Sequence, residues 1–246
     1  MTKVGQYEFL AEPFHCDFSW HLFMGHLGNH MLNAADFHSN DRGFGMHYLN
    51  TINKTWVLSR LAIEMEEMPP MYSRFYIETW VESAMRFFTN RNFLVTDTEN
   101  GKVYGYGRSV WAMIDTETRQ PTDILAINNG AINAYIEKEK LCPIEKGGRV
   151  KMSDLAELVH TVKTCYSDVD INGHINSIKY IEHVLDLWSL EWYREHTVKR
   201  LEIAYVAEAH GGDTLSFYRE QDAEGNYLVR IVRTDGTECC RCKIAF

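Results

Sequence analysis

Apolar and polar residues alternate along several stretches of the first half of the chain, and this pattern predicts β-strands. The stretches lie at residues 7–18, 55–63, 74–81, 91–98 and 102–114. Asn100-Gly101 separates the last two and favours the positive-φ turn of a hairpin. Residues 29–40 carry apolar side chains three and four positions apart, so they predict a helix. Gly25-His26-Leu27-Gly28, just before it, is typical of a turn.

The second half repeats this order. A strand is expected at residues 159–166, followed by a long helix that reaches about His196. The buried face of this helix is predicted at Ile178, Ile181, Leu185, Trp188 and Trp192. Further strands are expected to begin near Val198, Thr214, Tyr227 and Glu238. The chain is therefore predicted to contain two copies of a strand, a helix and an antiparallel meander.

The two copies can be aligned by short matching segments. Gly25-His26 is expected to correspond to Gly173-His174, and residues 60–63 to residues 200–203. Between the copies, residues 121–152 contain prolines, paired glycines and only a short helical patch, which is typical of a linker. The predicted organisation is an N-terminal domain at residues 1–120, this linker, and a C-terminal domain at residues 153–246. Each domain is expected to be α+β, with an antiparallel sheet around a central apolar helix.

Three polar residues that could carry chemistry, Asp170, Asn172 and His174, fall at every second position before the second helix. If the segment is extended, the three side chains share one face. Asn176 or Ser177 can cap the helix, whose first N–H groups would favour a developing negative charge. The alternative is a polar turn in which Asp and Asn side chains bond to their own backbone.

The first copy lacks this polar set in the alignment above. Met24 and Leu22 stand two and four residues before His26, so chemistry is expected in the second copy, and His26 is expected to be structural. The first copy is then free to hold something apolar.

Composition narrows the function classes. With 246 residues, 45% of them hydrophobic, the chain can bury one large core or two smaller ones. A net charge of -9 argues against binding to nucleic acid or to an anionic membrane. No apolar run is long enough to span a membrane, and the N-terminus lacks a signal-peptide core, so we expect a cytoplasmic protein.

The cysteines and histidines suggest two metal sites, both of which the patterns disfavour. Cys239, Cys240 and Cys242 lie in an alternating stretch that is better explained as a buried strand with free thiols. His26 and His30 could share a helix face, with His38 beyond, but no glutamate completes a zinc-hydrolase motif. We expect neither a metal nor a cofactor.

Asp170, Asn172, His174, Asn176 and Tyr180 together resemble the Asp-x-Asn-x-His-x-Asn-x-x-Tyr pattern of the acyl-acyl-carrier-protein thioesterases of plant plastids and bacteria. Residues 56–60 and 77–80, and the strand near Arg91, resemble the N-terminal domain of that family in order and spacing. The resemblance covers roughly residues 5 to 246. It implies two tandem hot-dog domains, in which an antiparallel sheet wraps around a central helix.

The resemblance also implies the chemistry. The catalytic group would be Asp170, Asn172 and His174, completed by a glutamate on the strand after the helix. Glu208 best matches this position, with Glu202 as the less favoured candidate. Glu208 and His174 would activate water, or Glu208 would attack the thioester directly to form an anhydride; the sequence does not separate these routes. Several plant members carry a cysteine where this chain has Ala209. Cys165 is expected to be an inert core thiol.

The implied reaction is hydrolysis of fatty acyl-acyl-carrier-protein, which releases a free fatty acid. An acyl-CoA thioesterase and a non-catalytic acyl-binding protein remain alternatives, as does a homodimer. The N-terminal domain is expected to hold the acyl chain through six residues: Met24, Leu27, Met31, Leu32, Trp56 and Met65. The acidic carrier protein would require a local basic patch. Its candidates are Lys179, Arg194, Lys199 and Arg200.

Overall fold

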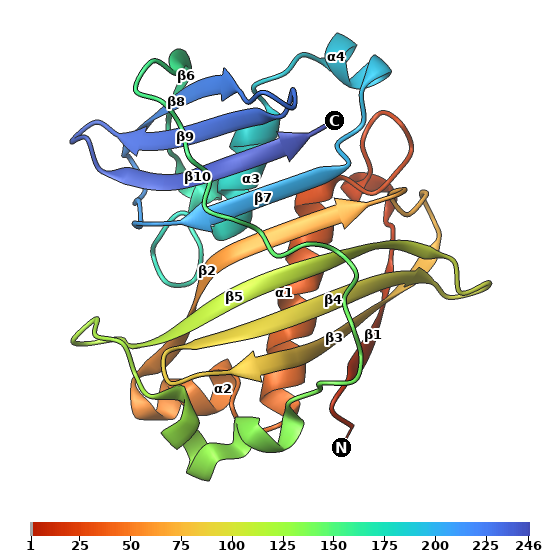
Figure 1. Cartoon of the computed structure of the whole chain (residues 1–246), viewed down its shortest axis with the longest axis vertical. Helices are drawn as coiled ribbons and strands as arrows, with labels where there is room; N and C mark the ends of the chain where they lie inside the picture. Colours follow the sequence, from red (N-terminus) through yellow and green to blue (C-terminus); the bar gives the residue numbers. More distant parts are fainter. Residues whose placement is uncertain (1) are drawn as a thin grey trace. The chain divides into compact units, whose positions relative to one another are not determined.

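The computed structural model describes residues 2–246, which form two compact units (Figure 1). The first unit extends to Lys146, and the second runs from Gly147 to Phe246. Each unit contains an antiparallel sheet and helices, so the α+β prediction is confirmed. No helix among the described residues is both long and apolar enough to cross a lipid bilayer.

The first unit is a twisted antiparallel sheet with one long helix packed on it (Figure 1). Its strands are β1 (Gly5–Leu10), β2 (Lys54–Met65), β3 (Arg74–Ala84), β4 (Phe88–Asp97) and β5 (Val103–Asp115). They pair in the order β1-β3-β4-β5-β2. Gly101 has a φ of 72°, so the predicted hairpin between β4 and β5 is confirmed.

Helix α1 (Met24–Asp41) begins earlier than the pattern predicted. Gly25-His26 was expected to form a turn but lies in the first turn of this helix, with Gly25 and Gly28 buried. The helix is preceded by η1 (Pro13–His15) and followed by α2 (Met46–Leu49) and η2 (Asn50–Ile52). Glycine costs about 1 kcal/mol in a helix interior, so tertiary packing has overridden local preference here.

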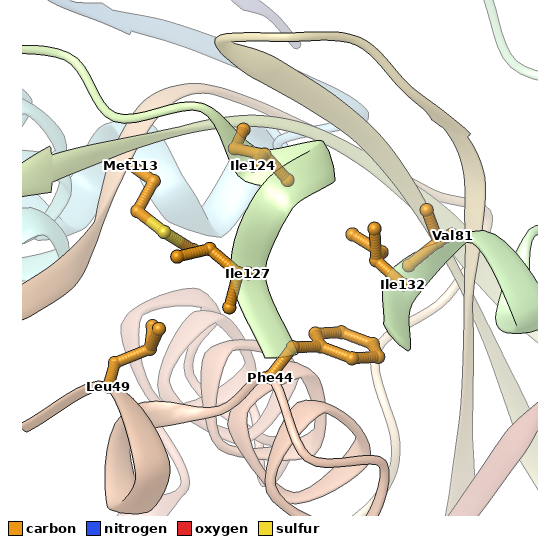
Figure 2. Close-up of a cluster of buried hydrophobic side chains, with 7 residues drawn as sticks. All are labelled: Phe44, Leu49, Val81, Met113, Ile124, Ile127 and Ile132. Atoms are coloured by element: carbon orange, nitrogen blue, oxygen red, sulfur yellow. The ribbon is translucent and has the colours of Figure 1, made fainter. Parts of the chain in front are cut away.

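The segment after β5 is not an extended connection. The 3-10 segment η3 (Ile124–Tyr135) is capped by Asp123 and is kinked at three left-handed residues, Asn128, Asn129 and Gly130. Figure 2 shows its isoleucines in a cluster of buried residues of the first unit that also contains Phe44. The cluster contains Phe44, Leu49, Val81, Met113, Ile124, Ile127 and Ile132. Cys142 and Ile144 then pack against Trp80.

The second unit repeats this sheet topology. Its strands are β6 (Glu157–Lys163), β7 (Arg200–Tyr205), β8 (Thr214–Gln221), β9 (Tyr227–Arg233) and β10 (Glu238–Ala245). They pair in the order β6-β8-β9-β10-β7, which matches the first unit strand for strand. The helix of this unit, α3 (Ser177–Leu185), contacts the sheet through Tyr180 against Tyr205 and His183 against Phe217. The predicted duplication is confirmed.

The long second helix is broken, contrary to the prediction. Helix α3 ends at Leu185, and a separate helix α4 (Leu190–Glu195) begins after Ser189, whose hydroxyl accepts a hydrogen bond from Trp192 N–H at 3.3 Å. Arg219 donates to the carbonyl of Leu187 at 3.4 Å in the gap. The apolar spacing continued through this gap because Trp188 packs against Tyr227, and not because the helix continues.

The alignment of the two copies at their Gly-His dipeptides is wrong. In the structure, the turn Asp17–His21 precedes α1 just as the turn Asp170–His174 precedes α3. Cys16 and Leu22 form an isolated β-bridge around the first turn, and Val169 and Ile175 form the same bridge around the second. His174 therefore corresponds to His21. The first copy therefore has polar residues at this turn, contrary to what the alignment of the Gly-His dipeptides suggested.

Candidate active site

The segment that carries His174 is a tight turn. It follows η4 (Tyr166–Asp168), and Gly173 adopts a φ of 80° within it. The N–H of Asp170 donates to the carbonyl of His174 at 2.8 Å, and Gly173 N–H donates to the carbonyl of Asp170 at 3.0 Å. Glycine supplies the positive φ at little cost, which is why the chain can reverse here.

Asp170 organises the backbone of this turn. Its Oδ1 accepts hydrogen bonds from the N–H groups of Asn172, at 2.8 Å, and His174, at 3.4 Å. The expectation that Asp170, Asn172 and His174 share the face of an extended strand is therefore wrong. The alternative of an Asp side chain bonding to its own turn describes the geometry of Asp170.

His174 meets Glu208 across the unit. The imidazole Nε2 lies 3.3 Å from Oε2 of Glu208, and both side chains are partly exposed, at 24% and 38%. The His174 ring also lies edge-on to the ring of His210, with 5.0 Å between centroids. A carboxylate against an imidazole, open to solvent, can take a proton from a water molecule and return it later.

Glu208 lies beyond the end of β7, not on the strand as expected from the resemblance. The neighbouring residue holds this segment in place: Ala209 accepts a hydrogen bond from Ile175 N–H at 2.9 Å, and its own N–H donates to the hydroxyl of Tyr180 at 3.1 Å. Arg233 donates to the carbonyl of Glu208 at 3.0 Å. Because Ile175 and Ala209 each follow a site residue, their bond brings His174 and Glu208 together.

Two asparagines flank His174, and their side chains make different contacts. Asn176 caps α3, with its side-chain oxygen accepting from Ile178 N–H at 2.8 Å, so this predicted capping role is confirmed. Asn172 is exposed, and no hydrogen bond engages its carboxamide among residues 2–246. Asn172 is therefore available to a ligand, whereas Asn176 is committed to the helix.

A second histidine–carboxylate pair was missed by the sequence analysis. His183 Nε2 lies 3.0 Å from Oδ1 of Asp168, whose other oxygen accepts from Cys165 N–H at 2.7 Å. Burial raises the pKa of the Asp168 carboxyl, but the bonds from Cys165 and His183 outweigh burial and hold that pKa below its ordinary value. The i and i+15 spacing of these residues carries no recognisable sequence signal.

The six predicted acyl-chain residues are spread along the first unit. Met24, Leu27 and Met31 are buried on α1, Met65 is buried at the end of β2, and Leu32 is half-buried. Trp56 packs against the cluster shown in Figure 2, and its indole N–H donates to the carbonyl of Phe44 at 2.9 Å. Met24 is the first residue of α1, whereas Phe44 follows the C-terminal end of this helix, so Trp56 lies at the opposite end of the helix from Met24.

Of the four predicted docking residues, two form ion pairs with neighbouring glutamates and two are exposed. Lys179 pairs with Glu182 at 2.5 Å, and Arg200 pairs with Glu202 at 2.8 Å. Lys199 and Arg194 are exposed. The Glu202 carboxylate also accepts from Gly148 N–H at 3.1 Å, which accounts for this glutamate structurally.

The structure also tests the predictions made for the cysteines and for His26, His30 and His38. Cys239, Cys240 and Cys242 are buried in β10 as free thiols, as expected. Cys165 was expected in the core but is exposed, with its sulfur 3.3 Å from the hydroxyl of Ser167. His38 lies apart from His26 and His30 and donates from Nε2 to the carbonyl of Lys3. In residues 2–246 no group of three or more His, Cys, Asp or Glu side chains is arranged to hold a metal.

Known proteins resemble this chain in sequence over most of its length. The family model described as Acyl-ACP thioesterase N-terminal domain matches residues 3–127, and the model described as Acyl-ACP thioesterase C-terminal domain matches residues 151–246. The palmitoyl-acyl carrier protein thioesterase of Gossypium hirsutum is 26% identical over 63% of this chain and 38% of that protein. The oleoyl-acyl carrier protein thioesterase 2 of Arabidopsis thaliana is 24% identical over 77% of this chain and 53% of that protein. The chain thus spans about half the length, or less, of these two relatives.

Solved structures of acyl-ACP thioesterases are also similar to this chain. An acyl-ACP thioesterase from Bacteroides thetaiotaomicron has 50% sequence identity and a TM-score of 0.92, with 99% of this chain and 98% of that chain covered. The 12:0-ACP thioesterase from Umbellularia californica has 18% identity and a TM-score of 0.86, with 99% and 97% covered, and shares the fold. Each unit accordingly has the hot-dog fold. With both family models matched in order, this chain belongs to the acyl-ACP thioesterase family.

Proposed function

We propose that the protein hydrolyses the thioester of fatty acyl-acyl-carrier-protein and releases a free fatty acid. The observation that carries this proposal is the pairing of His174 Nε2 with Glu208 Oε2 at 3.3 Å in a chain of this family. A thioester carbonyl needs an activated nucleophile and donors for the oxygen that becomes negative. The pair supplies the first requirement, and the unengaged Asn172 carboxamide supplies a donor for the second.

In the proposed reaction, Glu208 and His174 take a proton from water as its oxygen bonds to the carbonyl carbon. The Asn172 N–H₂ group donates to the developing oxyanion. Collapse of the tetrahedral intermediate breaks the carbon–sulfur bond, and the abstracted proton goes to the departing thiolate. Asp170 acts by holding the backbone of the turn, because its oxygen accepts from the N–H groups of Asn172 and His174. Direct attack by Glu208 to form an anhydride is the competing route.

The variants Glu208→Gln and His174→Ala test this assignment. Each is expected to lower kcat for decanoyl-carrier protein by at least about 10²-fold, the usual scale for an acid–base group, with an unchanged unfolding temperature. Glu202→Gln is the matched control, because Glu202 is the other candidate glutamate and bonds to Arg200 instead. Hydrolysis at near-normal rates in both site variants would falsify the proposal. Incorporation of oxygen from ¹⁸O-water into Glu208 during turnover would favour the anhydride route.

The carrier protein is proposed as the substrate carrier on family grounds, and acyl-CoA is the alternative. Hydrolysis of decanoyl-CoA and decanoyl-carrier protein by one preparation decides between them. Lys199 is exposed and is proposed to contact the acidic carrier, so Lys199→Glu should raise KM for the carrier thioester and not for decanoyl-pantetheine. An equal rise for both substrates would place docking elsewhere.

The first unit is proposed to accommodate the acyl chain along α1, through the buried side chains of Met24, Leu27 and Met31. A cytoplasmic location remains a prediction from the sequence; the plant relatives are named as chloroplastic proteins.

A further inference from the structure

The first unit contains a second copy of the turn that carries His174. Asp17 Oδ1 accepts a hydrogen bond from Ser19 N–H at 2.8 Å, the length of the equivalent bond at Asp170. Asp17 N–H donates to the carbonyl of His21 at 2.9 Å, against 2.8 Å in the other turn. Both turns share their hydrogen bonds and their place before a helix. His21 therefore occupies the position of the candidate catalytic histidine.

The imidazole of His21 is held in one tautomer. Its Nδ1 lies 2.7 Å from the carbonyl oxygen of Ser19, and a carbonyl oxygen only accepts, so Nδ1 carries the hydrogen. In the neutral ring, Nε2 is then a hydrogen-bond acceptor. No hydrogen bond engages this Nε2 within the described chain, residues 2–246. The ring is half-buried, so it can meet a ligand.

What the first copy lacks is the carboxylate. The N–H groups of Glu66 and Glu67 both donate to Tyr104, just beyond β2, as the N–H groups of residues 206 and 207 both donate to Cys239, just beyond β7. Leu22 N–H then donates to Pro69 in the first unit, where Ile175 N–H donates to Ala209 in the second. Residue 68 thus takes the place of Glu208, and it is a methionine. A thioether cannot take a proton from water.

A pocket adjoins this turn. It has a volume of about 370 Å³ and is lined by Pro13, Cys16, Asp17, Phe18, Trp20 and Met71. Trp20 has a φ of 65° where the other turn has Gly173 at 80°, and this tryptophan is 67% exposed. A bulky residue in the left-handed region is strained by about 1–3 kcal/mol. The strain accompanies an indole that forms one wall of the pocket.

We propose that the Asp17–His21 turn and this pocket bind an acyl-pantetheine thioester without hydrolysing it. The apolar walls suit the acyl chain and the methylenes of the pantetheine arm, and Nε2 of His21 accepts from one of its amide N–H groups. Asp17 is among the lining residues, and its negative charge disfavours an anion there, so the ligand is the uncharged thioester and not the fatty-acid product. The inference rests on the proposed function for its substrate class, but not for its location.

Titration of the whole protein with S-decyl-pantetheine, a thioether that cannot be hydrolysed, tests the second site. Calorimetry should show two ligands per chain in the wild type and one in Trp20→Gly, a change that suits the backbone φ and removes the indole. His21→Phe, which keeps an aromatic ring and removes Nε2, should weaken the second site at least about tenfold. Phe88→Ala removes another exposed aromatic of the same unit and should keep two ligands.

A single ligand per chain that is unaffected by Trp20→Gly and His21→Phe would overturn the proposal. Displacement of the Trp20-dependent ligand by decanoate would overturn its assignment to the uncharged thioester. Failure of the proposed function is distinguishable, because it would appear as absent hydrolysis of decanoyl-pantetheine by the wild type while the Trp20-dependent ligand still bound.

Discussion

The hydroxyl oxygen of Tyr180, on α3, lies 3.1 Å from the backbone nitrogen of Ala209 and accepts its hydrogen. Both residues are buried, and burial raises the pKa of the Tyr180 phenol, so the hydroxyl stays protonated. This bond connects the helix that follows His174 to the residue after Glu208. A hydrogen bond therefore joins helix α3 to the loop that carries Glu208, next to the candidate catalytic residues.

Tyr180→Phe should lower kcat roughly tenfold with little change in KM for decanoyl-pantetheine. The buried Ala209 N–H would lose its acceptor, at a cost of about 1–3 kcal/mol, and the loop that carries Glu208 would be less well held. The matched control is Tyr193→Phe, which removes the bond from the Tyr193 hydroxyl to the carbonyl of Leu185. A control that lost kcat equally would show that the effect is general destabilisation.

Asp170→Asn should keep most of the activity and stability, whereas Asp170→Ala should lower both. The reason is that Asp170 accepts from two backbone N–H groups, and the Asn carboxamide oxygen can accept from them as well. Steady-state kinetics and thermal unfolding of the two variants provide the measurement. A loss of 10²-fold or more in Asp170→Asn would mean that the negative charge itself is required.

Met68→Glu should create thioester hydrolysis at the first turn. Introduced into His174→Ala, it should raise decanoyl-pantetheine hydrolysis at least about tenfold above His174→Ala alone, because it restores a carboxylate opposite His21. Met68→Gln has the same length without the charge and should give no gain. Removal of His21 from the active variant should abolish the gain; a gain that survives would place the new activity elsewhere.

Stability should fall as the pH drops below about 6.5, through His38. Burial, with the charge of Arg91, lowers the pKa of His38 to about 3. Above pH 6.5 the imidazole is neutral in both the folded and the unfolded chain. Below it, the unfolded chain binds a proton that the folded chain refuses, so the free energy of unfolding decreases by up to about 1.4 kcal/mol per pH unit until the pH approaches 3.

His38→Gln should flatten this dependence, because the Gln amide does not titrate and can still donate to the carbonyl of Lys3. Urea unfolding between pH 7 and pH 4 measures the slope. The exposed His47 provides the control, and His47→Gln should leave the slope as in the wild type. Parallel curves for His38→Gln and the wild type would show that other groups dominate the pH dependence.

Alternating apolar residues and the Asn100-Gly101 turn were sufficient to predict the hairpins and the duplicated order, because strand period and positive-φ turns are local properties. The break between α3 and α4 was not predictable, since Trp188 continued the helical spacing while Arg219, distant in sequence, bonds the carbonyl of Leu187. The prediction that Glu208 lies near His174 rested on the family resemblance alone. It depends on the bond between Ile175 and Ala209, which no local pattern contains.

The repeated turn was missed for a specific reason. The two copies were matched at their Gly-His dipeptides, which pairs Gly25 with Gly173. In the structure, the left-handed position of the first turn is occupied by Trp20. Tryptophan rarely adopts a left-handed backbone conformation, so only the structure could show that Asp17 and His21 match Asp170 and His174.

The burial of Ile124, Ile127 and Ile132 in one cluster with Phe44 determines where the chain can be divided. A fragment cut at residue 127, where the N-terminal family match ends, would lose Ile132 and leave Trp80 without Cys142 and Ile144. Limited proteolysis and separate expression of the halves should therefore succeed near Gly147 and yield aggregating material near residue 127.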